Sequence, residues 1–79
     1  MNINITKSEA IKEINNGKTV VSQTIDGYIE IRQLRKSLYE IRVFENGEEL
    51  EVLRGDFKSL MKTINRSEGL TLKWDTYLK

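Results

Sequence analysis

Few side chains in this sequence could carry out covalent chemistry. The 79 residues include no histidine and no cysteine, so the usual general base, the commonest metal ligand and the thiolate nucleophile are all missing. The tyrosines Tyr28, Tyr39 and Tyr77 have no evident base as a partner, and nothing indicates a buried carboxylate with a shifted pKa. We therefore expect a protein that is not an enzyme and that uses no cofactor and no metal.

Glutamates gather around one predicted turn. Glu45, Glu48, Glu49 and Glu51 surround the dipeptide Asn46-Gly47. Their spacing differs from that of a calcium-binding loop, and no cage of oxygen ligands follows. Such an acidic hairpin tip either keeps a protein soluble or docks on a basic surface of a partner protein.

Composition narrows the class of protein. Thirteen Lys and Arg residues oppose twelve Asp and Glu residues, and the net charge of +1 argues against both a strongly basic nucleic-acid binder and an acidic nucleic-acid mimic. No apolar run approaches the roughly 20 residues that a membrane helix needs, and the first residues lack the pattern of a signal peptide. We expect one compact domain over residues 1–79 in the cytoplasm, with no membrane partner. The abundance of Asn, Ile and Lys is typical of AT-rich genomes, such as those of low-GC bacteria and their phages.

Two segments carry the signals of helix ends. Thr6 and Glu9 form a predicted capping box, and Gly17 suits the left-handed residue that ends a helix, which predicts a helix over about residues 7–16. Asp56 is the predicted N-cap of a second helix. The apolar residues of that helix recur at i, i+3, i+4 and i+7, and they are Phe57, Leu60, Met61 and Ile64.

The remaining apolar segments alternate as strands do. Strands are predicted over Lys18–Ile25, in a three-stranded meander from Tyr28 to Leu53, and over Leu70–Trp74, with room for a short strand at Ile3 and Ile5. The order is then α-β-β-β-β-α-β. It predicts an antiparallel sheet of four to five strands with two helices packed on one face, an α+β fold.

Hairpin turns set the register of the meander. Asp26-Gly27 and Asn46-Gly47 both favour two-residue turns. The second turn predicts the pairs Ile41 with Val52, Arg42 with Glu51, and Val43 with Leu50. A three-residue loop at residues 35–37 predicts the pairs Tyr28 with Phe44, Ile29 with Val43, Glu30 with Arg42, Ile31 with Ile41, and Arg32 with Glu40.

The first strand is the least regular. Val20, Ser22 and Thr24 give it an inner face that is only partly apolar, which is typical of an edge strand. The helices are then expected to cover an inner face made of Ile29, Ile31, Ile41, Val43, Leu50 and Val52.

The solvent-side face of the meander holds the residues that we single out for partner binding. Its rows across the three strands are Tyr28-Phe44-Glu49, Glu30-Arg42-Glu51 and Arg32-Glu40-Leu53. Two neighbouring exposed rings need either a cover from the chain termini or a partner. We expect Tyr28 and Phe44 to anchor a partner protein, while Arg42, Glu49 and Glu30 set its specificity.

A basic patch supports an alternative function. Arg32, Arg35, Lys36 and Arg54 are predicted at one end of the meander, where they could contact the phosphates of a single-stranded nucleic acid. The exposed aromatic rings would then stack on bases.

The segment from Lys18 to Ile64 resembles the single-strand-binding modules of the positive cofactor 4 type. It contains a hairpin, VVSQTIDGYIEIRQ, then further strands and the helix GDFKSLMKTI. The resemblance implies a curved sheet that binds single-stranded nucleic acid, a dimer formed through the C-terminal helix, and a binding role for Arg32. The chain departs from this family in its first helix, its final strand and its acidic third turn. The opening SEAIKEINNGKTVV is similar to the helix-turn-strand starts of small phage proteins.

The sequence predicts a small non-enzymatic protein that binds and inhibits a host macromolecule, with a protein as the expected partner. Phage or mobile-element anti-defence proteins, such as anti-CRISPR proteins, are the specific class that we expect. Two alternatives remain open at this stage. One is the single-stranded nucleic-acid-binding module, and the other is a structural homo-oligomer, such as a homodimer, closed through the sheet face or an edge strand.

Overall fold

The computed structural model describes residues 4–67 and 69–72. Their strands are β1 (Asn4–Ile5), β2 (Val20–Gln23), β3 (Gly27–Arg35), β4 (Leu38–Glu45), β5 (Glu48–Gly55) and β6 (Leu70–Leu72), and their helices are α1 (Lys7–Asn15) and α2 (Phe57–Arg66). The predicted α+β class is confirmed. The predicted strand residues Ile3 and Trp74 lie outside the described residues.

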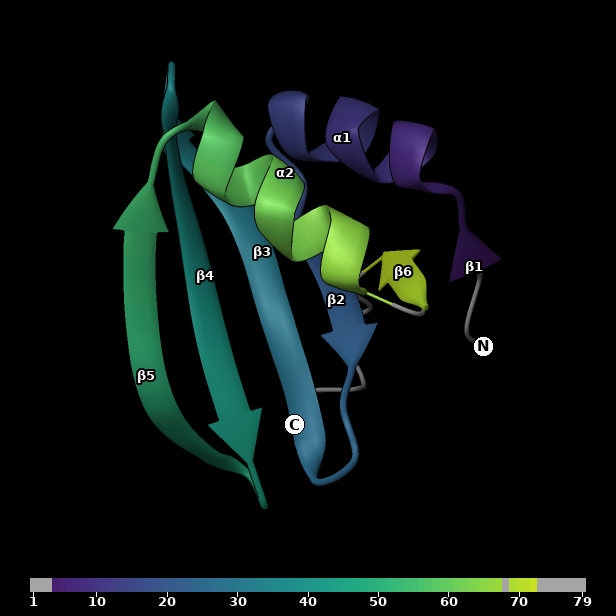
Figure 1. The fold of residues 1–79 in the computed structure, drawn as a ribbon, viewed down its shortest axis with the longest axis vertical. Coiled ribbons are helices and arrows are strands. Elements are labelled where there is room, and N and C mark those ends of the chain that lie inside the picture. Colours follow the sequence, from purple (N-terminus) through teal and green to yellow (C-terminus); the bar gives the residue numbers. More distant parts are fainter. Residues whose placement is uncertain (1–3, 68, 73–79) are drawn as a thin grey trace.

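The strands form one antiparallel sheet in the order β1-β6-β2-β3-β4-β5. Both helices lie on the same face of this sheet (Figure 1). The sheet exceeds the predicted four to five strands because the short segment Asn4–Ile5 pairs with β6. The helices therefore pack on a sheet that is wider than predicted.

Strand β2 is central, because it pairs with β3 on one side and with β6 on the other. Its predicted position at the sheet edge is wrong. Val20 and Val21 point to opposite faces and are both fully buried, and Ser22 is buried as well. A strand that is buried on both faces does not need to alternate apolar and polar residues. The irregular pattern of β2 therefore reflects burial rather than a position at the sheet edge.

The predicted helix caps are confirmed. The amide of Glu9 donates to Thr6 Oγ1 at 3.1 Å, and the amide of Thr6 donates to Glu9 Oε1 at 2.9 Å, which completes the capping box. Asp56 caps α2 by accepting a hydrogen bond from the amide of Ser59 at 3.0 Å. Gly17 has the expected positive φ, at 87°.

The core lies between the two helices and the sheet. Each helix contributes two fully buried residues, and strands β2, β3, β4 and β6 supply the rest. The cluster consists of Ala10, Ile14, Val20, Ile31, Tyr39, Ile41, Leu60, Ile64 and Leu70, with Ile5, Ile29 and Leu72 packed at its margin. The Tyr39 hydroxyl donates a hydrogen bond to Asn15 Oδ1 at 2.9 Å, so the one polar group of this cluster among the described residues has a partner at the end of α1.

The predicted register between β3 and β4 is confirmed from Tyr28, opposite Phe44, to Arg32, opposite Glu40. The connection differs from the predicted three-residue loop. Arg35 pairs with Leu38 across a two-residue turn, and the register shifts between Gln33 and Arg35. One extra strand residue has the same effect on the register as one extra loop residue, so the pairs that we predicted survive.

The predicted register between β4 and β5 holds only next to the turn. Phe44 pairs with Glu49, but Val43 then pairs with Glu51, so Leu50 is the extra residue of a β-bulge. Beyond the bulge Ile41 faces Leu53 and Arg42 faces Val52, so that with Val43 all three predicted pairs are corrected, and Glu40 faces Arg54 instead of Leu53. Leu50 is 55% exposed, and Val52 lies on the face opposite the helices, so neither belongs to the inner face as expected.

The turn between β2 and β3 lies one residue earlier than predicted. The amide of Thr24 donates to the Gly27 carbonyl at 2.9 Å, which makes Ile25 and Asp26 its central residues. Gly27 is needed for close packing instead, because a Cβ there would lie 2.0 Å from the Phe44 carbonyl oxygen. The amide of Asn46 donates to the Asp26 carbonyl at 3.0 Å and ties the two neighbouring turns together.

Candidate protein-binding surface

Five of the predicted site residues come together on the face opposite the helices, and we call them the aromatic–arginine cluster: Tyr28, Glu30, Arg42, Phe44 and Glu49. The rings of Tyr28 and Phe44 stack with centroids 4.7 Å apart and an interplanar angle of 18°. The Arg42 guanidinium carbon lies 5.3 Å from the centroid of the Phe44 ring, within the range of a cation–π interaction. Adjacent antiparallel strands produce this stack, because Tyr28 and Phe44 are directly opposite each other.

Two carboxylates fix the arginine of this cluster. Arg42 Nε donates to Glu49 Oε1 at 2.7 Å, and Arg42 Nη1 lies 3.6 Å from Glu30 Oε1. The hydrogen bond to Glu49 raises the pKa of Arg42 despite its partial burial, and the negative charges of Glu49 and Glu30 add to the effect. The predicted pairing of Arg42 with Glu51 is replaced by this contact with Glu49, because the bulge turns Glu51 to the helix side.

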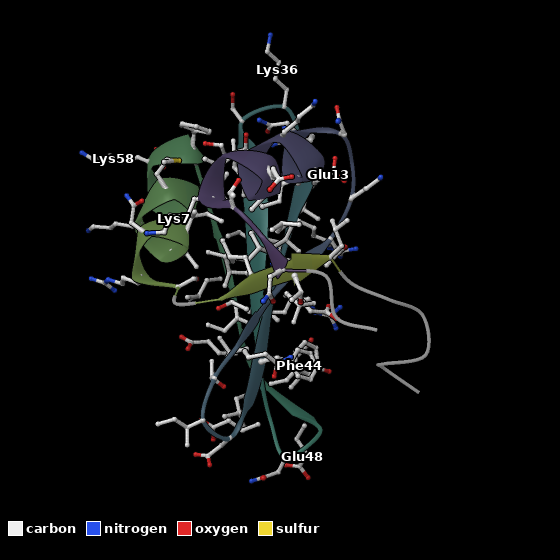
Figure 2. The ribbon with its side chains drawn as sticks, turned by 90° about the vertical axis from the view of Figure 1, so that its right-hand side faces the viewer. Lys7, Glu13, Lys36, Phe44, Glu48 and Lys58 are labelled. Carbon is white, nitrogen blue, oxygen red and sulfur yellow. The ribbon has the colours of Figure 1, made fainter. Side chains whose placement is uncertain are left out.

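Exposure divides the cluster into two groups. The side chains of Arg42 and Glu49 are 33% and 40% exposed, so a partner can reach both. Glu30 is only 3% exposed, which removes it from the predicted contact residues and makes it a residue that positions Arg42. Tyr28 and Phe44 are half-buried, and Figure 2 shows Phe44 between the helices and the tip at Glu48.

A second charged cluster lies on the same face, nearer to the β3–β4 turn. Glu40 accepts from Arg32 Nε at 2.9 Å with one carboxylate oxygen and from Arg54 Nε at 3.1 Å with the other. Burial alone would raise the pKa of the Glu40 carboxyl, but the hydrogen bonds and charges of Arg32 and Arg54 outweigh it, so this pKa lies below its usual value. Two of the four residues predicted to bind phosphates are thus engaged with a buried carboxylate.

The sequence reasoning missed the contact between Arg54 and Glu40. Under the predicted register Glu40 faced Leu53, and Arg54 had no partner. The signal was the segment Val52-Leu53, in which two adjacent apolar residues interrupt strict alternation. Such a doublet by itself fits either register, and the bulge at Leu50, which precedes it, places Leu53 on the helix side and Val52 on the opposite face.

The two ends of the meander carry opposite charge. Arg35 and Lys36 lie at the β3–β4 turn, and Lys36 stands at the far end of the molecule from Glu48 in Figure 2. The other end holds Asp26 in the β2–β3 turn and Glu45, Glu48 and Glu49 beside the Asn46-Gly47 turn, and we call it the acidic end. The aromatic–arginine cluster borders this acidic end.

No group of three or more acidic side chains in the described part of the chain is arranged to hold a metal ion. None of the described helices is long and apolar enough to cross a membrane. Comparison of the chain with protein-family models, with curated proteins and with solved structures found no match. The resemblance to the positive cofactor 4 type stays a hypothesis for the same reason.

Proposed function

We propose that this protein acts without catalysis by binding another protein through the aromatic–arginine cluster and the adjacent acidic end. The observation that carries the proposal is the fixed position of Arg42, which Glu49 and Glu30 hold beside the Phe44 ring. Arginine and aromatic side chains dominate the energetics of protein interfaces. Side chains already held in place lose less conformational entropy when a partner binds.

The charges of the acidic end indicate which kind of partner this surface would bind. Three glutamates of the β4–β5 hairpin stand within five residues of one another, with Asp26 on the neighbouring turn. A partner with a basic surface would be attracted over several ångströms and would associate faster at low salt. Inhibition of a host protein, in the manner of phage anti-defence proteins, is the specific role that we propose. Its support is compositional, because the abundance of Asn, Ile and Lys is typical of AT-rich genomes such as those of low-GC bacteria and their phages.

Affinity capture tests the proposal. The immobilised parent protein and the variant Phe44→Ser/Arg42→Gln are incubated with a lysate of a low-GC bacterium, with and without nuclease. We expect one or a few proteins that the parent retains after nuclease treatment and that the variant loses. Lys12→Gln, on the exposed surface of α1, is the control and retains them. Equal retention by parent and Phe44→Ser/Arg42→Gln would exclude this surface.

Binding of single-stranded nucleic acid is the second candidate, and the exposed residues Arg35 and Lys36 favour it. Its test is the fluorescence anisotropy of a labelled oligonucleotide at low and at physiological salt. Strong binding that weakens steeply with salt and disappears in Arg35→Gln/Lys36→Gln would support this candidate against the protein partner.

A homo-oligomer is the third candidate. Sedimentation of the parent protein and of Phe44→Glu separates it from the others. A parent protein that already sediments as a monomer rules out the homo-oligomer, whereas a parent oligomer that Phe44→Glu dissociates would place the interface on the cluster.

A further inference from the structure

The helix side of the sheet carries a groove whose apolar floor the proposed function does not use, although Asp26 and Glu45 of the acidic end also line it. Strands β3, β4 and β5 continue beyond the end of α2 (Figure 1). Along this stretch the described residues form a groove of about 810 Å³. Its floor is apolar and consists of Ile29, Ile41, Val43 and Leu53. Residues 22–26 form one side, and Thr63, Arg66 and Ser67 at the end of α2 close the top.

Element lengths explain why this groove exists. The nine residues of β3 span roughly 30 Å, whereas the ten residues of α2 span roughly 15 Å. The apolar alternation of the strands continues past the helix, so Leu53 remains 46% exposed and Ile25 at the rim is fully exposed. The chain thus presents apolar residues on the helix side of the sheet where no described helix covers them.

Acidic residues outnumber basic ones at the rim of the groove, where the other lining residues are uncharged. Asp26 and Glu45 line it, and Glu51 stands on the same side of the sheet, opposite Val43. Arg66 is the one cationic residue among those that line the groove. A partner segment would complement these acidic residues if it carried several lysines or arginines beside its apolar residues.

We propose that this groove binds a basic amphipathic α-helix of a partner protein, packed on the sheet in the same layer as α1 and α2. A helix suits the place because the floor residues come from three adjacent strands and form a row that an apolar stripe at i, i+3, i+4 and i+7 can cover. A small ligand suits it less, because more than half of the lining residues are exposed and a small ligand needs near-complete enclosure. The inference does not depend on the aromatic–arginine cluster, which lies on the opposite face.

The test uses synthetic peptides with the full chain. The probe is a fluorescein-labelled helix-forming peptide of about 15 residues, built from leucines at i, i+3, i+4 and i+7 spacing with lysines on the other positions. One companion peptide carries glutamate in place of lysine, and another has the lysine peptide's composition in an order without a stripe. Fluorescence anisotropy should show binding of the lysine peptide that is at least about tenfold tighter than that of either companion.

Variants of the protein locate the binding. Leu53→Asp should weaken binding of the lysine peptide at least about tenfold, while Leu50→Asp, at an exposed leucine outside the groove lining, should leave it unchanged. The exposed pair Asp26→Lys/Glu45→Lys leaves the floor intact and should reverse the preference between the lysine and glutamate peptides. Circular dichroism confirms that each variant folds.

Three results would overturn the inference. The first is equal binding of the striped and stripeless peptides, and the second is an unchanged preference in Asp26→Lys/Glu45→Lys. The third is a parent protein that self-associates and becomes monomeric in Leu53→Asp, because a second copy would then occupy the groove. None of these results bears on the capture experiment with Phe44→Ser/Arg42→Gln.

Discussion

At the scale of single residues, Glu40, Glu30 and Glu49 each pair with an arginine on the sheet face opposite the helices. Glu40 is 3% exposed and yet bonded through both oxygens, so its two arginines act as its replacement for water. Removal of either arginine would leave a buried charge only partly compensated and would destabilise the fold. The ionisation of Glu40 therefore links the fold to pH.

The acid sensitivity of the fold should depend on Glu40. Since its pKa is lowered in the folded state, the carboxylate contributes stability above the ordinary glutamate value of about 4.3, and this contribution disappears as pH falls through the lower folded-state pKa. We expect Glu40→Gln to be less stable than the parent at pH 7, and the difference to shrink below about pH 4. Urea unfolding midpoints measured between pH 7 and pH 3 check this.

The matched control for that experiment is Glu13→Gln. Glu13 pairs at 3.2 Å with Lys18, whose side chain is 62% exposed, so its removal should change stability little at any pH. The capping residues Glu9 and Asp56 also have a lowered pKa, mainly because each accepts a hydrogen bond from a backbone amide, so some acid sensitivity should persist in Glu40→Gln. A Glu40→Gln deficit that is constant over the whole pH range would contradict the expected linkage.

Gly27 should be the glycine that least tolerates a side chain. A Cβ at this position would meet the Phe44 carbonyl at 2.0 Å, and backbone on both strands would have to move. We expect Gly27→Ala to lower the free energy of unfolding by about 2 kcal/mol or more. Gly69→Ala is the control, because a Cβ at Gly69 meets nothing within 4 Å, and chemical denaturation of both variants against the parent decides the matter.

At the scale of elements, local signals predicted what local chemistry determines. The capping box at Thr6 and Glu9, the N-cap at Asp56 and the Asn46-Gly47 turn, with φ of 51° and 82°, all formed where the sequence placed them. These motifs depend on hydrogen bonds within a few residues. The β3–β4 register also followed from the pattern, since any one-residue slip would have put charged residues on the helix side.

Two features could not be predicted from the sequence, because contacts between separate strands determine them. The bulge at Leu50 depends on the preference of Glu40 for Arg54 and of Ile41 for Leu53, which a turn rule cannot weigh. The central place of β2 depends on β6, a strand that lies almost fifty residues away. The β3–β4 register placed Tyr28, Phe44, Glu30 and Arg42 together as expected, whereas the burial of Glu30 has no local sequence signal, and the role of these residues in partner binding stays a prediction.

The corrected register can be checked by truncating apolar side chains. Ile41 is 7% exposed, so Ile41→Ala should destabilise the fold by about 2–5 kcal/mol. Leu50 is 55% exposed, so Leu50→Ala should stay within about 0.5 kcal/mol of the parent, whereas the register without a bulge would have buried it. Nuclear Overhauser contacts between Ile41 and Leu53, in place of Ile41 and Val52, would confirm the pairing directly, and their absence would return Val52 to the core.

At the scale of the whole molecule, the buried core and the proposed binding surfaces lie in different parts of the fold. The helices and the strand portions beneath them contain the buried cluster, while the acidic end of the meander extends past them with a proposed binding surface on each face. The two surfaces share strands β3 and β4. Each proposed partner can still be removed separately, since the variants Phe44→Ser/Arg42→Gln and Leu53→Asp alter different faces.

The bulge at Leu50 also has a consequence for protein handling in solution. Strand β5 is an outer strand of the sheet, and a long, flat outer strand without such a bulge can pair with strands of other molecules until fibrils form. The bulge bends this edge and the glutamates charge it. Deletion of Leu50 would leave the pairs from Val43–Glu51 onward unchanged while straightening the strand, so we expect a folded protein that forms thioflavin-positive aggregates faster than the parent. Equal lag times for the deletion variant and the parent would show that the glutamates alone protect the edge.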